Sequence, residues 1–441
     1  MTADMGMDTD TTRFERRFPL LLGAVTLLAL LLRVAGLGSQ PPSLDDYAVA
    51  NTAVNYVEGG QLGPTMWNHP GLRNVLVYWS MQLFGAGAAG VKGWSVLSGT
   101  LSVPLLALVA RRLTGSAVVG LTAAILWGME PLAVDFSRQG INDIYLAFFS
   151  LAGIWLALRF RDGHNPWWLV AAGIAFGLGL ASKWSVVFPL AVTGVLLLAD
   201  QFRGHGETAG LRACRLAFLA ASLAILPLTV YLLTFAPWFG RGYSLDEWPT
   251  LQKAMYRETK LHVGYQPTVT GDHRARQWFV RPVAFRESFP LVRREKNIPT
   301  EPGVKDKMVM LVAIANPLAW LPVLPAVAWT AWRGCRERRG MLLYLAALFG
   351  ASYLPLAVAW RPIWVNTAVS VLPFAFMAVS WAMWDILGCP PRRRMLLAAW
   401  LALTVAVSAS LYPLAIGKGL QIPVVRDYLL EHYADDNPHG E

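Results

Sequence analysis

The sequence is poor in charged residues, which make up only 15% of its 441 residues, and it contains only 3 cysteines. Soluble globular chains carry about 25% charged residues, so this chain has too few to cover a water-exposed surface. The low charge excludes a soluble enzyme and a disordered protein, and the few cysteines exclude a disulfide-rich secreted module. Hydrophobic residues reach 55%, and the mean hydropathy is +0.41. We therefore predict an all-α polytopic membrane protein.

Eleven apolar segments are long enough to be membrane spans, because a helix needs about 20 apolar residues to cross the hydrocarbon. The predicted spans are 17–37, 90–110, 115–134, 141–159, 166–181, 184–200, 214–235, 307–331, 341–359, 362–387 and 394–414. Segment 72–86 is apolar but short, so we interpret it as an interfacial helix, with a twelfth span as the alternative.

The connections between these spans predict the orientation of the chain. If the N-terminus is cytoplasmic, most arginines of the short connections lie inside, and the short outer connections hold only Arg73, Lys92, Arg138, Lys183 and Arg361. This asymmetry fits the positive-inside rule. Cys214, Cys335 and Cys389 also fall on the inner side, where thiols stay reduced.

The predicted organisation has three parts. Residues 1–16 form a disordered cytoplasmic N-terminus, 17–414 the transmembrane domain, and 415–441 an outer tail. Within the transmembrane domain, two long loops, 38–89 and 236–306, lie on the outer side. The net charge of +10 is explained by basic cytoplasmic loops, so we expect membrane lipids and no nucleic acid as partners.

Charge is also scarce in the middle of the predicted spans. Transporters and pumps hold ionisable residues at mid-depth, and many transporters show internal repeats. We find neither feature, so a transporter or flippase is disfavoured, and the charged residues that could do chemistry lie in the outer connections. The sequence therefore indicates chemistry at the outer membrane surface.

The acidic candidates are Asp45, Asp46 and Asp143. Asp45-Asp46 follows the first span closely, with Ser43 as a plausible helix N-cap. The pair could serve as a general base or a metal ligand, or it could simply stabilise a helix start. Asp143 opens span 141–159, where it could stabilise the helix or add a carboxylate to the same pocket.

The other candidates are basic, aromatic or imidazole side chains on the same predicted face. Lys183 and Arg361 could bind a lipid phosphate or only extend toward the headgroups. Loop 236–306 mixes bases with aromatics, and could be an interfacial segment or a basic loop resting on anionic lipid. The candidate substrate-binding residues are His69, Arg73, Arg138, Lys183, Trp184, Trp278, Arg281 and Arg361.

Taken together, these segments resemble the protein O-mannosyltransferases, glycosyltransferase family 39 of the GT-C membrane glycosyltransferases. Aminoarabinose transferases that modify lipid A share the architecture. The matching series, in order along the chain, is Asp45-Asp46, His69-Pro70-Gly71-Leu72-Arg73-Asn74, Leu83-Phe84-Gly85, Gly93-Trp94, Arg138 with Asp143, Gly177 to Lys183-Trp184, Trp278 with Arg281-Pro282-Val283, and Asn316-Pro317.

Two departures from the family pattern stand out. Asp46 replaces a glutamate, and Gly71 and Arg73-Asn74 replace a proline and a Gly-Lys pair. The long outer loop carries no extra sugar-binding domain, unlike that of the eukaryotic enzymes. A bacterial or archaeal enzyme of the inner membrane is therefore expected, with its active site on the outer face.

The resemblance implies an inverting transfer of a hexose, with mannose favoured, from a polyprenyl-phosphate donor to a hydroxyl acceptor, with Ser/Thr of a protein favoured. Asp45 is the implied general base, and Asp46 and Asp143 orient the acceptor or the base. Lys183, Arg138, Arg73 and Arg361 would stabilise the leaving phosphate, and His69 would line the pocket. Transfer to a lipid or glycan acceptor stays open, as do a polyprenyl-sugar transporter and a non-catalytic scaffold. No cofactor is required by the sequence, although two carboxylates and a histidine could hold Mg²⁺ or Mn²⁺.

Overall fold

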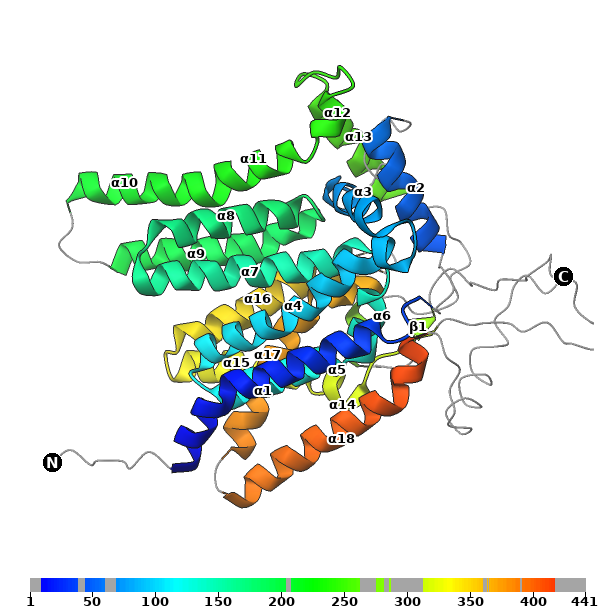
Figure 1. Cartoon of the computed structure of the whole chain (residues 1–441). Helices are drawn as coiled ribbons and strands as arrows, with labels where there is room; N and C mark the ends of the chain where they lie inside the picture. Colours follow the sequence, from blue (N-terminus) through cyan, green and yellow to red (C-terminus); the bar gives the residue numbers. More distant parts are fainter. Residues whose placement is uncertain are drawn as a thin grey trace, which may run out of the picture.

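The structure is a computed structural model of the whole chain, shown in Figure 1. It describes residues 9–38, 44–59, 69–203, 208–261, 275–280, 285–286, 312–359, 363, 365–388 and 391–416.

Helices dominate the part of the chain that the structure describes. In chain order they are α1 (Thr9–Val34), α2 (Leu44–Glu58), α3 (Leu72–Phe84), α4 (Ala88–Thr114), α5 (Ala117–Met129), α6 (Pro131–Ser137), α7 (Asn142–Gly163), α8 (Pro166–Leu180), η2 (Trp184–Val186), α9 (Val187–Arg203), α10 (Ala209–Ala220), η3 (Ala221–Ile225), α11 (Leu226–Leu233), α12 (Ala236–Phe239), α13 (Trp248–Leu261), η4 (Ala275–Gln277), α14 (Pro317–Trp320), α15 (Val323–Arg336), α16 (Gly340–Ala357), η5 (Val365–Ser370), α17 (Leu372–Leu387) and α18 (Pro391–Ala415). Two short antiparallel strands, β1 (Phe285–Arg286) and β2 (Val312–Ala313), also pair.

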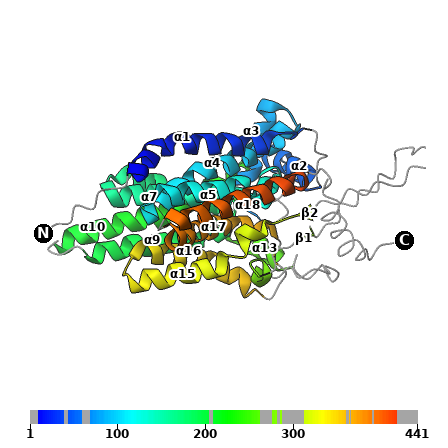
Figure 2. The same ribbon diagram turned by 90° about the horizontal axis from the view of Figure 1, so that it is seen from below.

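The long helices lie side by side in one bundle, and the short helices α2, α3, α12 and α13 gather at one end of it (Figures 1 and 2). We call this the site end, and the end that carries the turns at Gly115 and His164 the far end. Among the described residues, 7 helices are long and apolar enough to cross a membrane, or 8 if the bent pair α5–α6 is one span. The predicted polytopic all-α membrane protein is confirmed.

Local sequence signals set the helix boundaries at the far end. α4 ends at Gly115, which adopts a positive φ of 76°, and Ser116 then caps α5 by accepting a hydrogen bond from Val119 N. α7 likewise ends at His164, and Asn165 caps α8 with Pro166 in its first turn. These caps satisfy backbone groups that the helix ends would otherwise leave unpaired. They allow a short turn to join α4 to α5, and another to join α7 to α8.

Several predicted boundaries need correction. α1 already begins at Thr9, so 9–16 are helical rather than part of a disordered N-terminus. The predicted span 307–331 begins at Pro317 and is broken between α14 and α15. The predicted span 362–387 becomes a helix only at Leu372, because the 3-10 turn η5 precedes it. Residues 1–8 and 417–441 lie outside the described residues.

The predicted span 115–134 is bent by 61° between α5 and α6. Pro131 follows Glu130 at the break, and proline cannot donate the backbone hydrogen bond that would continue the helix. The bend turns α6 across the site end of the bundle. The interfacial prediction for 72–86 agrees with α3, whose 13 residues are not among the helices that could span.

Candidate functional site

A partly buried ion pair joins two connections at the site end. Asp143 lies in the first turn of α7, and Lys183 lies between α8 and η2. The Lys183 Nζ atom is 2.6 Å from Asp143 Oδ1, and the two side chains are 19% and 3% exposed. A pair withdrawn from water is costly to break, so it holds these two connections together.

Two polar residues of η5 complete this pair. Asn366 Nδ2 donates to Asp143 Oδ2 at 3.4 Å, and Lys183 Nζ lies 3.5 Å from Thr367 Oγ1. The sequence analysis missed both residues because they fell inside the predicted span 362–387. Their signal was present, since the Asn366-Thr367 pair interrupts the apolar run that follows Pro362. Arg361 lies outside the described residues.

The first turn of α3 is tied to both connections. Leu72 N donates to Ala181 O at 3.1 Å, and the buried Arg73 guanidinium donates to Gly140 O at 3.4 Å. Arg73 therefore lies at the junction of the segments that carry Asp143 and Lys183. His69 precedes this turn and is half-buried.

Helix α2 positions the acidic pair Asp45-Asp46 at the same end of the bundle. A Cβ at Gly140 would lie only 3.0 Å from Val49 Cγ1, so α2 packs directly onto the connection before Asp143. Asp45 and Asp46 lie one helical turn before Val49. Their side chains lie outside the described residues, but their backbone places both at the site end.

A second group of cations is buried beside α6. Arg138 caps α6 and its Nη1 donates to Arg33 O and Ala35 O, both at 2.8 Å. Arg33 Nε donates to Ser137 Oγ at 3.0 Å, and both guanidinium groups are fully buried. The sequence analysis missed Arg33, although a charge inside an otherwise apolar span is a functional signal in itself.

The predicted aromatic residues have different surroundings. Trp184 Nε1 donates to Tyr231 OH at 2.9 Å, and Tyr231 OH in turn donates to Gln252 Oε1 on α13. Trp278 is fully buried in the apolar core, which neither the interfacial nor the basic-loop interpretation of its segment predicted. Arg281 lies outside the described residues.

No group of three or more His, Cys, Asp or Glu side chains that could hold a metal ion occurs within the described ranges. The side chains of the predicted acidic pair Asp45-Asp46 lie outside the described residues.

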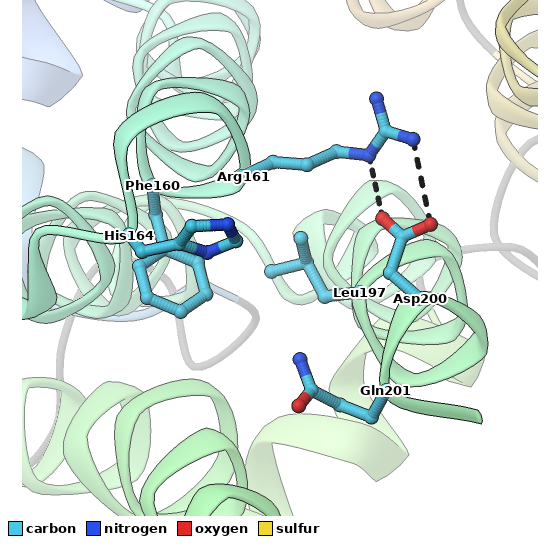
Figure 3. A pocket seen from close by; sticks show the side chains of 6 residues that line it. All are labelled: Phe160, Arg161, His164, Leu197, Asp200 and Gln201. Atoms are coloured by element: carbon cyan, nitrogen blue, oxygen red, sulfur yellow. Dashed lines mark hydrogen bonds and ion pairs between the residues drawn. The ribbon is translucent and has the colours of Figure 1, made fainter. Parts of the chain in front are cut away.

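A separate hollow of about 280 Å³ lies at the far end, between α7 and α9 (Figure 3). Its polar centre is the pair of Arg161 and Asp200, with Nε 2.5 Å from Oδ2. The His164 ring stands edge-on to Phe160 beside it. The two opposite charges satisfy each other, so this hollow adds nothing to the chemistry of the site end.

Comparison with known proteins agrees with the family resemblance of the sequence motifs. A family model described as dolichyl-phosphate-mannose-protein mannosyltransferase matches residues 23–241. A polyprenol-phosphate-mannose–protein mannosyltransferase of Mycolicibacterium smegmatis is 25% identical, over 89% of this chain and 88% of its own length. The corresponding enzyme of Corynebacterium glutamicum is 23% identical, over 92% and 91% of the two chains.

Solved structures share the fold. The protein O-mannosyltransferase Pmt1-Pmt2 complex of S. cerevisiae aligns with a TM-score of 0.66 at 13% identity, covering 91% of this chain and 90% of that one. ArnT of Cupriavidus metallidurans aligns with a TM-score of 0.53 at 15% identity, covering 97% and 76%. The fold and the polar site end define a membrane glycosyltransferase of the GT-C class. Within that class, the chain belongs to the protein O-mannosyltransferase family, as the motif series of the sequence predicted.

Proposed function

We propose that this protein transfers mannose from a polyprenyl-phosphate-mannose donor to a Ser or Thr hydroxyl of a protein, with inversion at the anomeric carbon. The observation that carries the proposal is the ion pair of Lys183 with the buried Asp143 carboxylate, which shares the site end with Arg73, Arg138 and the backbone of the acidic pair. The names of the mycobacterial and corynebacterial relatives support the same donor and acceptor classes.

The proposed reaction needs a base for the acceptor. The hydroxyl oxygen attacks the anomeric carbon, its proton goes to the Asp45 carboxylate, and the bond between the anomeric carbon and the phosphate oxygen breaks. A positioned general base contributes about 10²–10⁴-fold to such a step. Asp46 and Asp143 orient the base and the acceptor, and His69 lines the sugar pocket.

The leaving group is a phosphate monoester anion, so its departure is favoured by cations fixed near the developing charge. Lys183, Arg73, Arg138 and Arg361 have this role in the proposal. Trp184 and Trp278 support the donor side of the site through packing, and Arg281 is retained as a proposed substrate-binding residue. Because these cations supply the charge stabilisation, we propose a metal-independent transfer. Activity after EDTA treatment, compared with added Mg²⁺ or Mn²⁺, tests that point.

The direct experiment is incubation of the purified protein with polyprenyl-phosphate-mannose and a Ser/Thr-rich peptide. A hexose added to the peptide, with the opposite anomeric configuration to the donor, is the expected product by mass spectrometry and NMR. A product on a lipid or glycan would support the alternative acceptor class. Donor movement across vesicles without any product would support a transporter instead.

We also propose that the site end faces outward from a prokaryotic plasma membrane, with the N-terminus in the cytoplasm. Cys214 and Cys335 are exposed at the far end, so both should resist a membrane-impermeant maleimide in intact cells and react after permeabilisation. An Ala86→Cys variant, made at the site end, should react in intact cells. The reverse labelling pattern would overturn this orientation.

A further inference from the structure

A buried carboxylate lies at the break between α5 and α6, and the proposed reaction does not use it. Glu130 is only 1% exposed, and it directly precedes the helix that ends at Arg138. Its Oε1 atom accepts a hydrogen bond from Asn316 N at 3.1 Å. Burying an ionisable group inside a membrane bundle costs free energy, so the contacts of Glu130 are candidates for a functional role.

Asn316 links Glu130 to α18. It is fully buried, and its Nδ2 atom donates to both Thr404 O and Ser408 Oγ at 2.8 Å. Its Oδ1 atom accepts from Leu318 N and so caps α14. Asn316 also follows β2, the point at which the long outer loop returns to the bundle. Glu130 therefore fixes the returning end of that loop.

α18 leads back to α6 through α1. Tyr412 OH donates to Leu32 O at 2.8 Å, and the next residue, Arg33, offers its carbonyl oxygen to Arg138 Nη1. Since Arg138 ends the helix that starts beside Glu130, the contacts form a closed ring. The ring runs from Glu130 through Asn316, α18 and α1 to Arg138 (α1, α6 and α18 are labelled in Figure 1).

We propose that Glu130 is a positioning residue for donor binding, acting through this ring to fix the Arg138 guanidinium and to tie the return of the long outer loop to the donor side. The inference rests on the proposed function, since Arg138 is there assigned to the donor phosphate. In this proposal, Glu130 acts by accepting the hydrogen bond from Asn316 N. A glutamine at this position therefore retains the contact, and an alanine loses it.

The test uses the full-length protein in detergent or vesicles, with polyprenyl-phosphate-mannose as the varied substrate. Glu130→Ala should raise the donor KM about tenfold while changing kcat less, which is the pattern of lost ground-state binding. Glu130→Gln should stay within about threefold of the wild type. Asp385→Ala is the matched control, because Asp385 is a partly buried carboxylate at the far end that accepts from Trp329 Nε1 and pairs with Arg333.

A second variant keeps the test informative if Glu130→Ala folds poorly. Tyr412→Phe removes only the hydroxyl that bonds Leu32 O, and it should raise the donor KM by about twofold to threefold. Combined with Glu130→Ala, its effect should be non-additive, because residues of one network couple. Combined with Glu130→Gln, it should raise the donor KM as it does in the wild type, because the glutamine retains the contact. An unchanged donor KM in both Glu130→Ala and Tyr412→Phe would overturn the proposal. An equal rise in Asp385→Ala would also overturn it, because general loosening would then explain the effect.

Failure of the proposed function is recognised separately, because the wild type would then show no transfer from this donor. Amide exchange measured without any donor still tests the ring. Glu130→Ala should speed exchange in 132–138 and 314–320, and Asp385→Ala should leave both segments unchanged. Unchanged exchange in Glu130→Ala would show that the ring does not hold these segments.

Discussion

The two ends of the bundle are both polar, but they use charge in different ways. At the far end, Arg161 and Asp200 pair while 29% and 22% exposed, and Arg111 pairs with Glu15 while both are exposed by more than a third. At the site end, Lys183 and Asp143 pair while 19% and 3% exposed, so the carboxylate is buried. Exposed pairs contribute about 0–1 kcal/mol, whereas removing one partner of a buried pair costs about 3–5 kcal/mol.

The arginines differ in the same way. At the far end, Arg159 lies over the rings of Trp155 and Trp168, an arrangement that suits a headgroup layer. At the site end, Arg33 and Arg138 donate hydrogen bonds to backbone carbonyls of neighbouring segments and to Ser137 Oγ. We infer that far-end cations anchor the protein in its membrane, whereas site-end cations are fixed by hydrogen bonds to neighbouring segments. The following substitutions test this division.

Asp45→Asn is expected to have the largest effect. If the Asp45 carboxylate takes the acceptor proton, its loss should lower kcat by about 10²–10⁴-fold and leave the donor KM nearly unchanged. Steady-state transfer to a Ser/Thr peptide measures both constants, and Asp46→Asn serves as the neighbouring control with a smaller expected loss. Wild-type turnover in a folded Asp45→Asn protein would remove Asp45 from the role of base.

Lys183→Ala should have the next largest effect, on both binding and stability. It leaves the Asp143 carboxylate buried without its ammonium partner, so the melting temperature should fall, and the donor KM should rise about 10–100-fold with the loss of a phosphate contact. The double variant Lys183→Met with Asp143→Leu removes both charges. It should recover stability without recovering donor affinity.

That double variant separates the two roles of Lys183. If donor affinity returns together with stability, the lysine serves only to hold α7 and η2 in place. If neither stability nor donor affinity returns, the fold requires the ion pair itself, and apolar side chains cannot replace it.

The sequence predicted much of the frame of the molecule, because apolar run length is a strong signal for membrane spans. Every predicted span has a helical counterpart, although the break at Glu130 and the late start of α17 at Leu372 were missed. Both errors have one cause: hydropathy averages over a segment and does not register where a proline or a 3-10 turn interrupts the backbone. Motif order also predicted the family correctly.

The partnerships within the site could not be predicted in the same way. Asp143 and Lys183 were each predicted as candidates, but their ion pair depends on α7 and α8 packing as a hairpin. Asn366 and Arg33 were missed because they lie inside apolar runs, where a single polar residue hardly changes the average. The loop that holds Trp278 was interpreted as an interfacial segment or as a basic loop resting on anionic lipid, and neither interpretation predicted that the Trp278 side chain is fully buried. Contacts between distant segments depend on tertiary packing, which one sequence does not specify residue by residue.

A smaller effect is expected for Trp184→Phe, at the edge of the site end. The phenylalanine ring keeps most of the packing but loses the Nε1 hydrogen bond to Tyr231 OH, a contact that contributes about 0.5–1.5 kcal/mol. The melting temperature should fall slightly and the donor KM should rise by about twofold to threefold. Tyr231→Phe, which removes the other half of this bond, should reproduce the change in melting temperature. A loss of activity as large as that of Lys183→Ala would instead make Trp184 a direct donor contact.

The smallest effect is expected for Arg161→Gln, in the hollow at the far end (Figure 3). The glutamine keeps much of the volume and can still donate to Asp200, and the pair that it replaces is partly exposed, so stability should change by about 1 kcal/mol or less. The donor KM and kcat should both stay within about twofold of the wild type, because Arg161 lies at the opposite end of the bundle from the proposed chemistry. If Arg161→Gln lowered transfer as strongly as Lys183→Ala, the far-end hollow would take part in the reaction cycle. The division between an anchoring end and a reacting end would then be wrong, because a charge exposed at one end would control chemistry at the other.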